Sequence, residues 1–191
     1  MSGSERDPED SSVPGEGADP FELLGVPVRF DLDVEAARSR LRRKVAALHP
    51  DRFTDPVEIE RVTRAAAALN EAWTLLSDDE RRANLVLSRL GGPAPHEDRS
   101  LPPEFLQDML SIRMELEEAL EQSDRAEIGR LREWVASHRA ELRERVRLGL
   151  EHLSEGAGEA GAIRLDLNVW RYIERMDEQL SGTAVADGPE P

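Results

Sequence analysis

A proline at position 50 separates two apolar repeats of helical spacing, and this break most constrains the fold. Apolar residues recur at three- and four-residue steps over residues 34–48 and again over residues 62–76. Such spacing places the apolar side chains on one face of a helix. Proline lacks a backbone donor and disfavours the α conformation of the residue before it, so the first helix must end near His49. The two repeats therefore predict an antiparallel helical hairpin with a polar corner.

Capping residues predict where the helices of this region begin. Asp33 stands before the first helix, and Asp55 followed by Pro56 begins the second. The run Ser77-Asp78-Asp79-Glu80 has the pattern of a capping box and predicts a third, shorter helix. Gly91-Gly92-Pro93 predicts the end of that helix.

The corner carries the tripeptide His49-Pro50-Asp51 and follows a basic stretch. Residues 38–52 contain six basic residues and one acid, although the formal net charge of the whole chain is −15. A local reversal of charge steers an acidic protein surface towards the hairpin. An isolated basic run is more often a solvated helix face, but its position beside the corner favours the binding interpretation here.

The span 19–90 resembles a J-domain, the module that stimulates ATP hydrolysis by DnaK-type chaperones. Residues 19–26 are similar to its first short helix, and residues 69–78 are similar to its third. Lys44 stands where that family usually has a buried leucine. Its alkyl stem is expected to lie on the core while its ammonium group reaches water, so we expect a slightly weakened hairpin. The chaperone-binding residues that the resemblance and the basic stretch imply are His49, Pro50, Asp51, Arg38, Arg42 and Arg43.

Three further helices are predicted beyond a loop that contains Pro93 and Pro95. The first begins at Pro102-Pro103 and ends near Gln122, the second lies between Asp124 and Leu153, and the third follows a glycine-rich break. The shared apolar face of the third consists of Leu165, Val169, Ile173, Met176 and Leu180. These helices predict a three-helix bundle, and the fold class is all-α.

The helix that begins at Pro102-Pro103 carries two apolar stripes. One stripe is expected in the core and consists of Phe105, Met109, Ile112, Leu116 and Leu120. Leu106, Leu110 and Met114, four residues apart, form a second stripe well away from the first. A bundle helix needs one apolar face, so two faces indicate either a fully buried helix or a binding surface.

A J-domain followed by such a bundle resembles the HscB family, the co-chaperones of iron–sulfur cluster assembly. Residues 105–118 are similar to the start of that family's bundle, and residues 80–92 are similar to the end of its J-domain. The resemblance implies a protein that activates the ATPase of a DnaK/HscA-type chaperone and delivers an IscU-type scaffold protein to it. The scaffold-binding positions so implied, with Met114 extending the apolar stripe, are Leu106, Leu110, Met114, Glu118 and Tyr172. The chain departs from the family pattern at Gln107, which replaces an apolar residue, and at Ser111 and Met114, where acids are expected.

The expected organisation has five parts. Residues 1–18 and 183–191 are expected to be disordered tails because they are rich in small, polar and acidic residues. Between them we expect a J-domain over 19–92, a linker over 93–101 and the three-helix bundle over 102–182.

Composition excludes several other functions. The chain has no cysteine, which excludes disulfides and thiolate metal sites, and its net charge of −15 argues against nucleic acid as the main ligand. His96, His138 and His152 lack metal-ligand spacing, so neither a metal nor a cofactor is expected. Without a signal peptide or an apolar run long enough to span a bilayer, no membrane association and a cytoplasmic location are expected.

Two other functions remain open from the sequence. A general J-domain co-chaperone for unfolded clients is the nearer one, although the glycine-phenylalanine linker and cysteine zinc repeats common in that class are absent. A purely structural helical bundle would leave the charged corner unexplained. An enzyme is not expected, because His49 and Asp51 have neither a third orienting group nor a nucleophile beside them in the sequence, so no catalytic residue is assigned.

Overall fold

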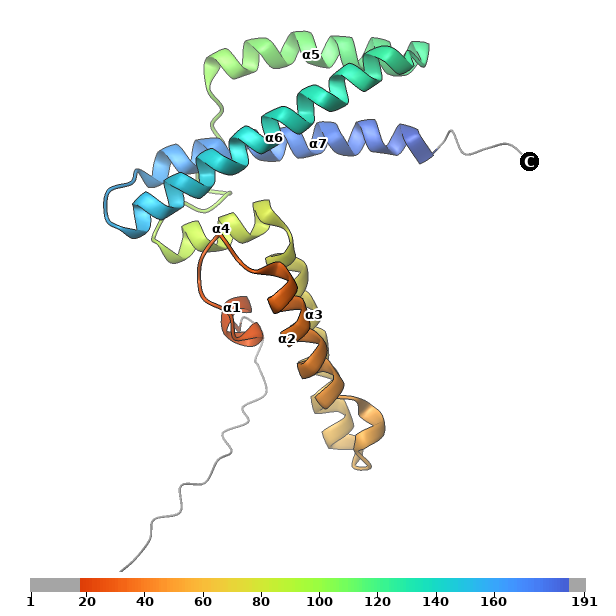
Figure 1. Cartoon of the computed structure of the whole chain (residues 1–191), viewed down its shortest axis with the longest axis vertical. Coiled ribbons are helices and arrows are strands. Elements are labelled where there is room, and N and C mark those ends of the chain that lie inside the picture. The colour runs from red at the N-terminus through yellow and green to blue at the C-terminus, as the bar shows by residue number, and fades with distance from the viewer. Residues whose placement is uncertain (1–17, 186–191) are drawn as a thin grey trace, which may run out of the picture. The chain divides into compact units, whose positions relative to one another are not determined.

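The computed structural model describes residues 18–185, in which helices are joined by loops (Figure 1). Over that range the chain forms seven α-helices and one short 3-10 helix, with no strand. The predicted all-α class is therefore confirmed. The chain divides into two compact units, one that ends at Ser77 and one that begins at Asp78. Most of the two predicted tails, residues 1–17 and 186–191, lies outside the described residues.

The first unit consists of four helical elements, the two longest of which form the hairpin. These are α1 (Pro20–Leu24), α2 (Val34–Ala47), the 3-10 helix η1 (Pro50–Arg52) and α3 (Pro56–Ser77), and both α1 and α2 pack against α3. The buried apolar side chains of this unit are Phe21, Leu24, Phe30, Ala37, Leu41, Val62, Ala65, Leu69, Ala72 and Leu76. The predicted hairpin is present, with its core on the predicted apolar faces.

The helix starts of this unit follow the predicted capping chemistry. The Asp33 carboxylate accepts a hydrogen bond from the backbone N–H of Ala36 at 2.9 Å, and Asp55 accepts one from Val57 at 3.1 Å. Each satisfies a backbone donor that has no partner within its helix. α1 ends at Gly25, whose φ of +67° is rarely adopted by residues with a side chain.

Lys44 and Arg40 of α2 bind the carboxyl end of α1. Lys44 Nζ donates to the carbonyl oxygen of Leu23 at 2.5 Å, and Arg40 Nη1 donates to that of Gly25 at 2.9 Å. Cations are favourable at a helix carboxyl terminus because its last carbonyl groups lack partners within the helix. The Lys44 side chain is exposed, as expected, and its ammonium in addition links α2 to the end of α1.

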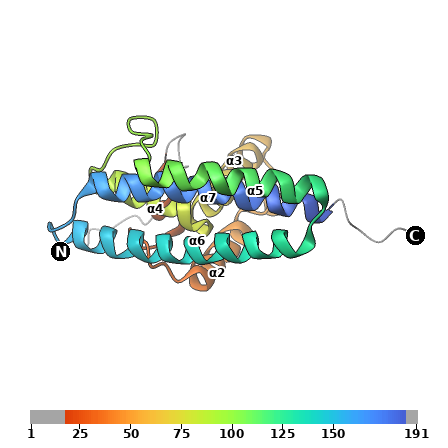
Figure 2. The same ribbon diagram turned by 90° about the horizontal axis from the view of Figure 1, so that it is seen from above.

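The second unit contains four helices (Figure 2). They are α4 (Asp79–Arg89), α5 (Pro103–Gln122), α6 (Arg125–Ser154) and α7 (Ala160–Val185). α6 packs along α7, α5 packs against α6, and α4 packs against both α6 and α7. The predicted helices of the bundle are thus present, and α4 shares their unit although the sequence groups its residues with the hairpin.

The core of the second unit extends beyond the predicted stripes. Trp170 is among its largest buried side chains, and its indole Nε1–H donates to Glu174 Oε1 at 2.8 Å. The predicted face of α7 included Leu165, which is only half-buried, and missed Ile163 and Leu167, which are buried. α7 packs against α4 as well as α6, so a wider arc of its surface is covered than one stripe would suggest.

Two predicted boundaries differ from the structure. The N-cap of α4 is Asp78, whose carboxylate accepts a hydrogen bond from the backbone N–H of Arg81 at 2.8 Å, whereas Ser77 is the last residue of α3. α7 continues to Val185, so the predicted tail over 183–191 begins too early. A single glycine such as Gly182 weakens a helix but does not by itself end it.

Candidate partner-binding surfaces

The corner of the hairpin presents two polar side chains to solvent. The side chains of His49 and Asp51 are 60% and 87% exposed; His49 caps the 3-10 turn η1, and Asp51 lies within it. The backbone N–H of Asp51 donates to His49 Nδ1 at 3.3 Å, and Asp51 Oδ2 lies 3.5 Å from the same ring nitrogen. These contacts hold the ring against the turn.

The predicted basic face lies exposed on α2. Arg38, Arg42 and Arg43 are exposed, and among the described residues none of them forms an ion pair. Arg43 Nη1 donates only to the hydroxyl of Ser39 at 3.2 Å. Arg38 and Arg42 are four residues apart and therefore lie on the same side of α2. Their charges are available to an acidic partner surface.

The second apolar stripe of α5 faces solvent. Leu106, Leu110 and Met114 are 50%, 66% and 65% exposed, whereas Met109 and Leu116 of the same helix are 3% and 2% exposed. The helix therefore uses one apolar side for the bundle and leaves the other uncovered within the described part of the chain. Contiguous exposed apolar side chains mark interaction surfaces more often than single ones do.

Glu118 and Tyr172 lie at opposite ends of this stripe. Glu118 is exposed one turn beyond Met114 and accepts a hydrogen bond from Gln122 Nε2 at 2.9 Å. The half-buried Tyr172 of α7 packs edge-on against the ring of Phe105, with the ring centroids 5.5 Å apart. Phe105 directly precedes Leu106, so α7 contributes Tyr172 beside the start of α5. The structure thus gathers the five predicted scaffold-binding residues along one region of the second unit.

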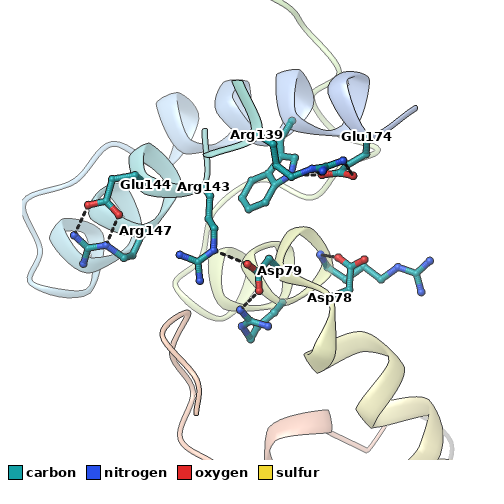
Figure 3. A network of polar contacts seen from close by, with 10 residues as sticks. Asp78, Asp79, Arg139, Arg143, Glu144, Arg147 and Glu174 are labelled. Atoms are coloured by element: carbon teal, nitrogen blue, oxygen red, sulfur yellow. Dashed lines mark hydrogen bonds and ion pairs between the residues drawn. The ribbon is translucent and has the colours of Figure 1, made fainter. Parts of the chain in front are cut away.

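A set of ion pairs that sequence reasoning missed ties α4 and α7 to α6 (Figure 3). Arg143 Nε of α6 donates to Asp79 Oδ2 at 2.5 Å, and Arg82 of α4 also pairs with Asp79. Burial raises the pKa of the Asp79 carboxyl, but these arginines outweigh it, so the pKa lies below its ordinary value. Arg139 of α6 donates two hydrogen bonds to the Glu174 carboxylate of α7, at 2.7 and 2.8 Å.

Neither surface has the features of a metal centre. In the part of the chain that the structure describes, no three or more His, Cys, Asp or Glu side chains are grouped so that they could hold a metal ion. None of the described helices is long and apolar enough to cross a membrane. What the two surfaces offer is exposed charge in the first unit and exposed apolar area in the second.

Comparison with known proteins found similarity to HscB proteins. The model of the HSCB C-terminal oligomerisation domain matches residues 101–181. The co-chaperone protein HscB homolog of Bordetella petrii is 28% identical over 171 residues, which cover 88% of this chain and 97% of that one. Residues 101–181 thus match the HscB C-terminal domain, and most of the chain is similar to an HscB co-chaperone. The resemblance found from the sequence is therefore confirmed.

Further HscB proteins are also similar to this chain in sequence or in fold. The HscB homolog of Vibrio cholerae is 37% identical over 100 residues, covering 51% of this chain and 58% of that one. The crystal structure of human HscB superposes with a TM-score of 0.79 at 20% identity, covering 91% of this chain and 86% of that one. The HscB structure from Vibrio cholerae gives a TM-score of 0.60 at 26% identity, with coverages of 85% and 99%. The predicted scaffold-binding residues all lie inside the segment matched by the HscB domain model, whereas the His49–Asp51 corner lies outside it.

Proposed function

We propose that this HscB-family co-chaperone acts in iron–sulfur cluster assembly by stimulating the ATPase of a DnaK/HscA-type chaperone and delivering an IscU-type scaffold protein to it. The observation that carries the proposal is the exposure of Leu106, Leu110 and Met114 inside the segment that matches the HscB C-terminal domain. A bundle that served only to fold would gain stability by covering these side chains. Their exposure is explained if a partner protein covers them.

The first unit is suited to contact the chaperone. The unpaired arginines of α2 attract an acidic surface at long range, which raises the rate of encounter more than the final affinity. The short 3-10 turn at Pro50 presents His49 and Asp51 in one conformation, so little conformational freedom is lost on binding. ATP hydrolysis itself would occur in the chaperone, and this chain would act by favouring one chaperone conformation over another.

The α5 surface is suited to contact the scaffold protein. Covering a leucine or methionine side chain fully contributes roughly 1.5–3 kcal/mol, so three such residues supply a useful part of a binding free energy. Met114 has a flexible, polarisable side chain that adapts to an uneven partner surface. Glu118 adds a charge at one end of the stripe, where it would remain partly hydrated and contribute mainly to specificity.

The decisive experiment measures ATP hydrolysis by a DnaK/HscA-type chaperone with this chain alone, with an IscU-type scaffold alone and with both. The proposal expects each protein to stimulate alone and the pair to stimulate more than the sum of the two. Direct binding of the scaffold to the chain is measured in parallel by calorimetry. Stimulation without scaffold binding, together with suppression of aggregation of unfolded proteins, would instead indicate the general co-chaperone function.

A further inference from the structure

A pocket of about 550 Å³ lies in the second unit between the loop of residues 93–101 and α7. Its basic lining residues are His96, Arg99, Arg164, Arg171 and Arg175. One carboxylate, Glu80, lines it as well. We call this the arginine pocket. Four arginines around a single acid stand out in a chain that carries 40 acidic against 25 basic residues.

The walls of the arginine pocket are held by specific contacts. Asn168 Nδ2 of α7 donates to the carbonyl oxygens of Asp98 and Ser100, at 3.1 and 2.9 Å. Asp98 Oδ1 in turn accepts a hydrogen bond from the backbone N–H of Ser100 at 2.8 Å. The loop is therefore fixed along α7, and the pocket between them is part of the folded unit.

Arg164 provides the independent sign that this pocket receives a ligand. This residue is 1% exposed; Nη2 donates to Asn84 Oδ1 at 2.6 Å, and Nη1 donates to the carbonyl oxygen of Pro93 at 3.4 Å. Its Nε is buried and has no hydrogen-bond partner among the described residues, and none of their carboxylates lies within ion-pair distance of its guanidinium. Burial lowers the pKa of this guanidinium, while Glu80 and Asp98 raise it only through space. A buried cation without a direct counter-charge is costly, so an anion in the pocket would stabilise it.

The remaining arginines of the pocket are available to such an anion. Arg171 Nη1 reaches Glu80 Oε1 only at 3.4 Å, and its side chain is 56% exposed. Arg99 and Arg175 are exposed and form no ion pair with any residue in the described range. Solvated arginines of this kind are common on surfaces, but here they surround the buried, uncompensated Arg164.

We propose that the arginine pocket binds a small oxyanion with two or more negative charges, carried by phosphate or carboxylate groups. Guanidinium groups match both kinds of oxyanion through paired N–H···O hydrogen bonds. The pocket volume lies within the range of small-molecule sites, and Leu167 and Tyr172 give it an apolar side. The pocket shares Tyr172 with the predicted scaffold-binding residues but lies apart from the proposed chaperone contacts, and anion binding to its arginines does not depend on the proposed function.

The test titrates the full chain with inorganic pyrophosphate and, separately, with citrate by calorimetry at low ionic strength. Both anions carry several charges, and the tighter one identifies phosphate or carboxylate as the preferred group. In the Arg99→Ala/Arg175→Ala variant we expect the dissociation constant of the preferred anion to rise by about tenfold or more, because contacts with two charged donors are removed. The control is Arg81→Ala/Arg61→Ala, which changes the net charge equally at exposed sites outside the pocket and should leave the affinity unchanged.

Two outcomes would overturn the proposal. One is that neither anion binds at millimolar concentration. The other is that the pocket variant and the control variant lose affinity equally, which would indicate general attraction of anions to the surface. Arg164 is tested in the unaltered chain, since its contacts with Asn84 make substitution a risk to folding. Its Nε–H resonance should shift and saturate with the calorimetric dissociation constant, and an unmoved resonance in the presence of saturating pyrophosphate would also contradict the site.

Discussion

Lys44 Nζ lies 2.5 Å from the carbonyl oxygen of Leu23, so a lysine of α2 binds the end of the short helix α1. α1 has only five residues and would be marginal alone, because isolated helices of this length do not offset the cost of nucleation. The burial of Phe21 and Leu24 secures one side of it, and Lys44 with Arg40 secures its end.

Replacing Lys44 by methionine should therefore destabilise the first unit slightly. The side chain is exposed, so loss of the hydrogen bond should lower the free energy of unfolding by about 1 kcal/mol or less. Urea denaturation measures this change. Arg38→Met is the control, because Arg38 is exposed on the same helix without an ion pair, and an equal effect of both substitutions would argue against the α1 contact.

His49→Gln or Asp51→Asn should abolish stimulation of the chaperone ATPase. Both side chains are exposed and neither is part of the core, so helical content and melting temperature should remain close to those of the unaltered chain. Steady-state ATPase assays and circular dichroism provide the two measurements. Full stimulation by either variant would show that the corner does not contact the chaperone.

Reversing Arg42 and Arg43 to glutamate should slow association with the chaperone. The wild-type association rate should itself fall with salt, because exposed charges are screened beyond about 10 Å at 0.1 M ionic strength. Stopped-flow kinetics over a salt series measures both effects. Arg61→Glu/Arg64→Glu makes the same charge change on α3 and serves as the control; a wild-type rate insensitive to salt would show that the α2 arginines are only solvated.

Replacing Leu106, Leu110 and Met114 together by alanine should weaken scaffold binding and cost little stability, because all three are exposed. Leu116→Ala should instead lower the free energy of unfolding by about 2–5 kcal/mol, since that side chain is buried. Chemical denaturation and titration with the scaffold separate the two effects. Val28→Ala/Leu148→Ala, at two exposed apolar positions elsewhere, is the control for general loss of apolar surface. Normal scaffold binding by the folded triple variant would locate the scaffold contact elsewhere.

The Asp79 ion pairs should make the second unit less stable in acid. The folded pKa of this carboxyl is depressed, so its contribution is present above the ordinary value of 3.8 and is lost as the pH falls from there through the lower folded value. Asp79→Asn should accordingly be less stable than the unaltered chain at pH 7, and the difference should shrink below pH 3.8. Urea denaturation across this range measures it, and a difference that stays constant with pH would mean that the carboxylate charge is not what holds Arg143.

Local signals in the sequence were sufficient for much of this fold. Asp33 as a cap, Pro50 as a break and the apolar faces of α2 and α3 each depend on residues within a few positions of one another, and all three are present. The exposed stripe on α5 could also be predicted, because two apolar faces on one helix are visible in its spacing.

Contacts between distant residues could not be predicted in this way. Arg143 and Asp79 are 64 residues apart, and Arg164 and Asn84 are 80 apart, so no local pattern pairs them. The burial of Trp170 has a related cause, since it depends on α4 and α6 covering different sides of α7. The arginine pocket could not be predicted for the same reason, because its residues come from α4, the loop 93–101 and α7.

The uncovered stripe on α5 also bears on how copies of this chain behave in solution. Three exposed apolar side chains would promote self-association, but a net charge of −15 makes each copy repel the next. That repulsion is screened by salt, whereas apolar attraction is not. High ionic strength should therefore favour self-association of the chain through this face. At low ionic strength, the acidic composition keeps the chain soluble although the stripe is exposed.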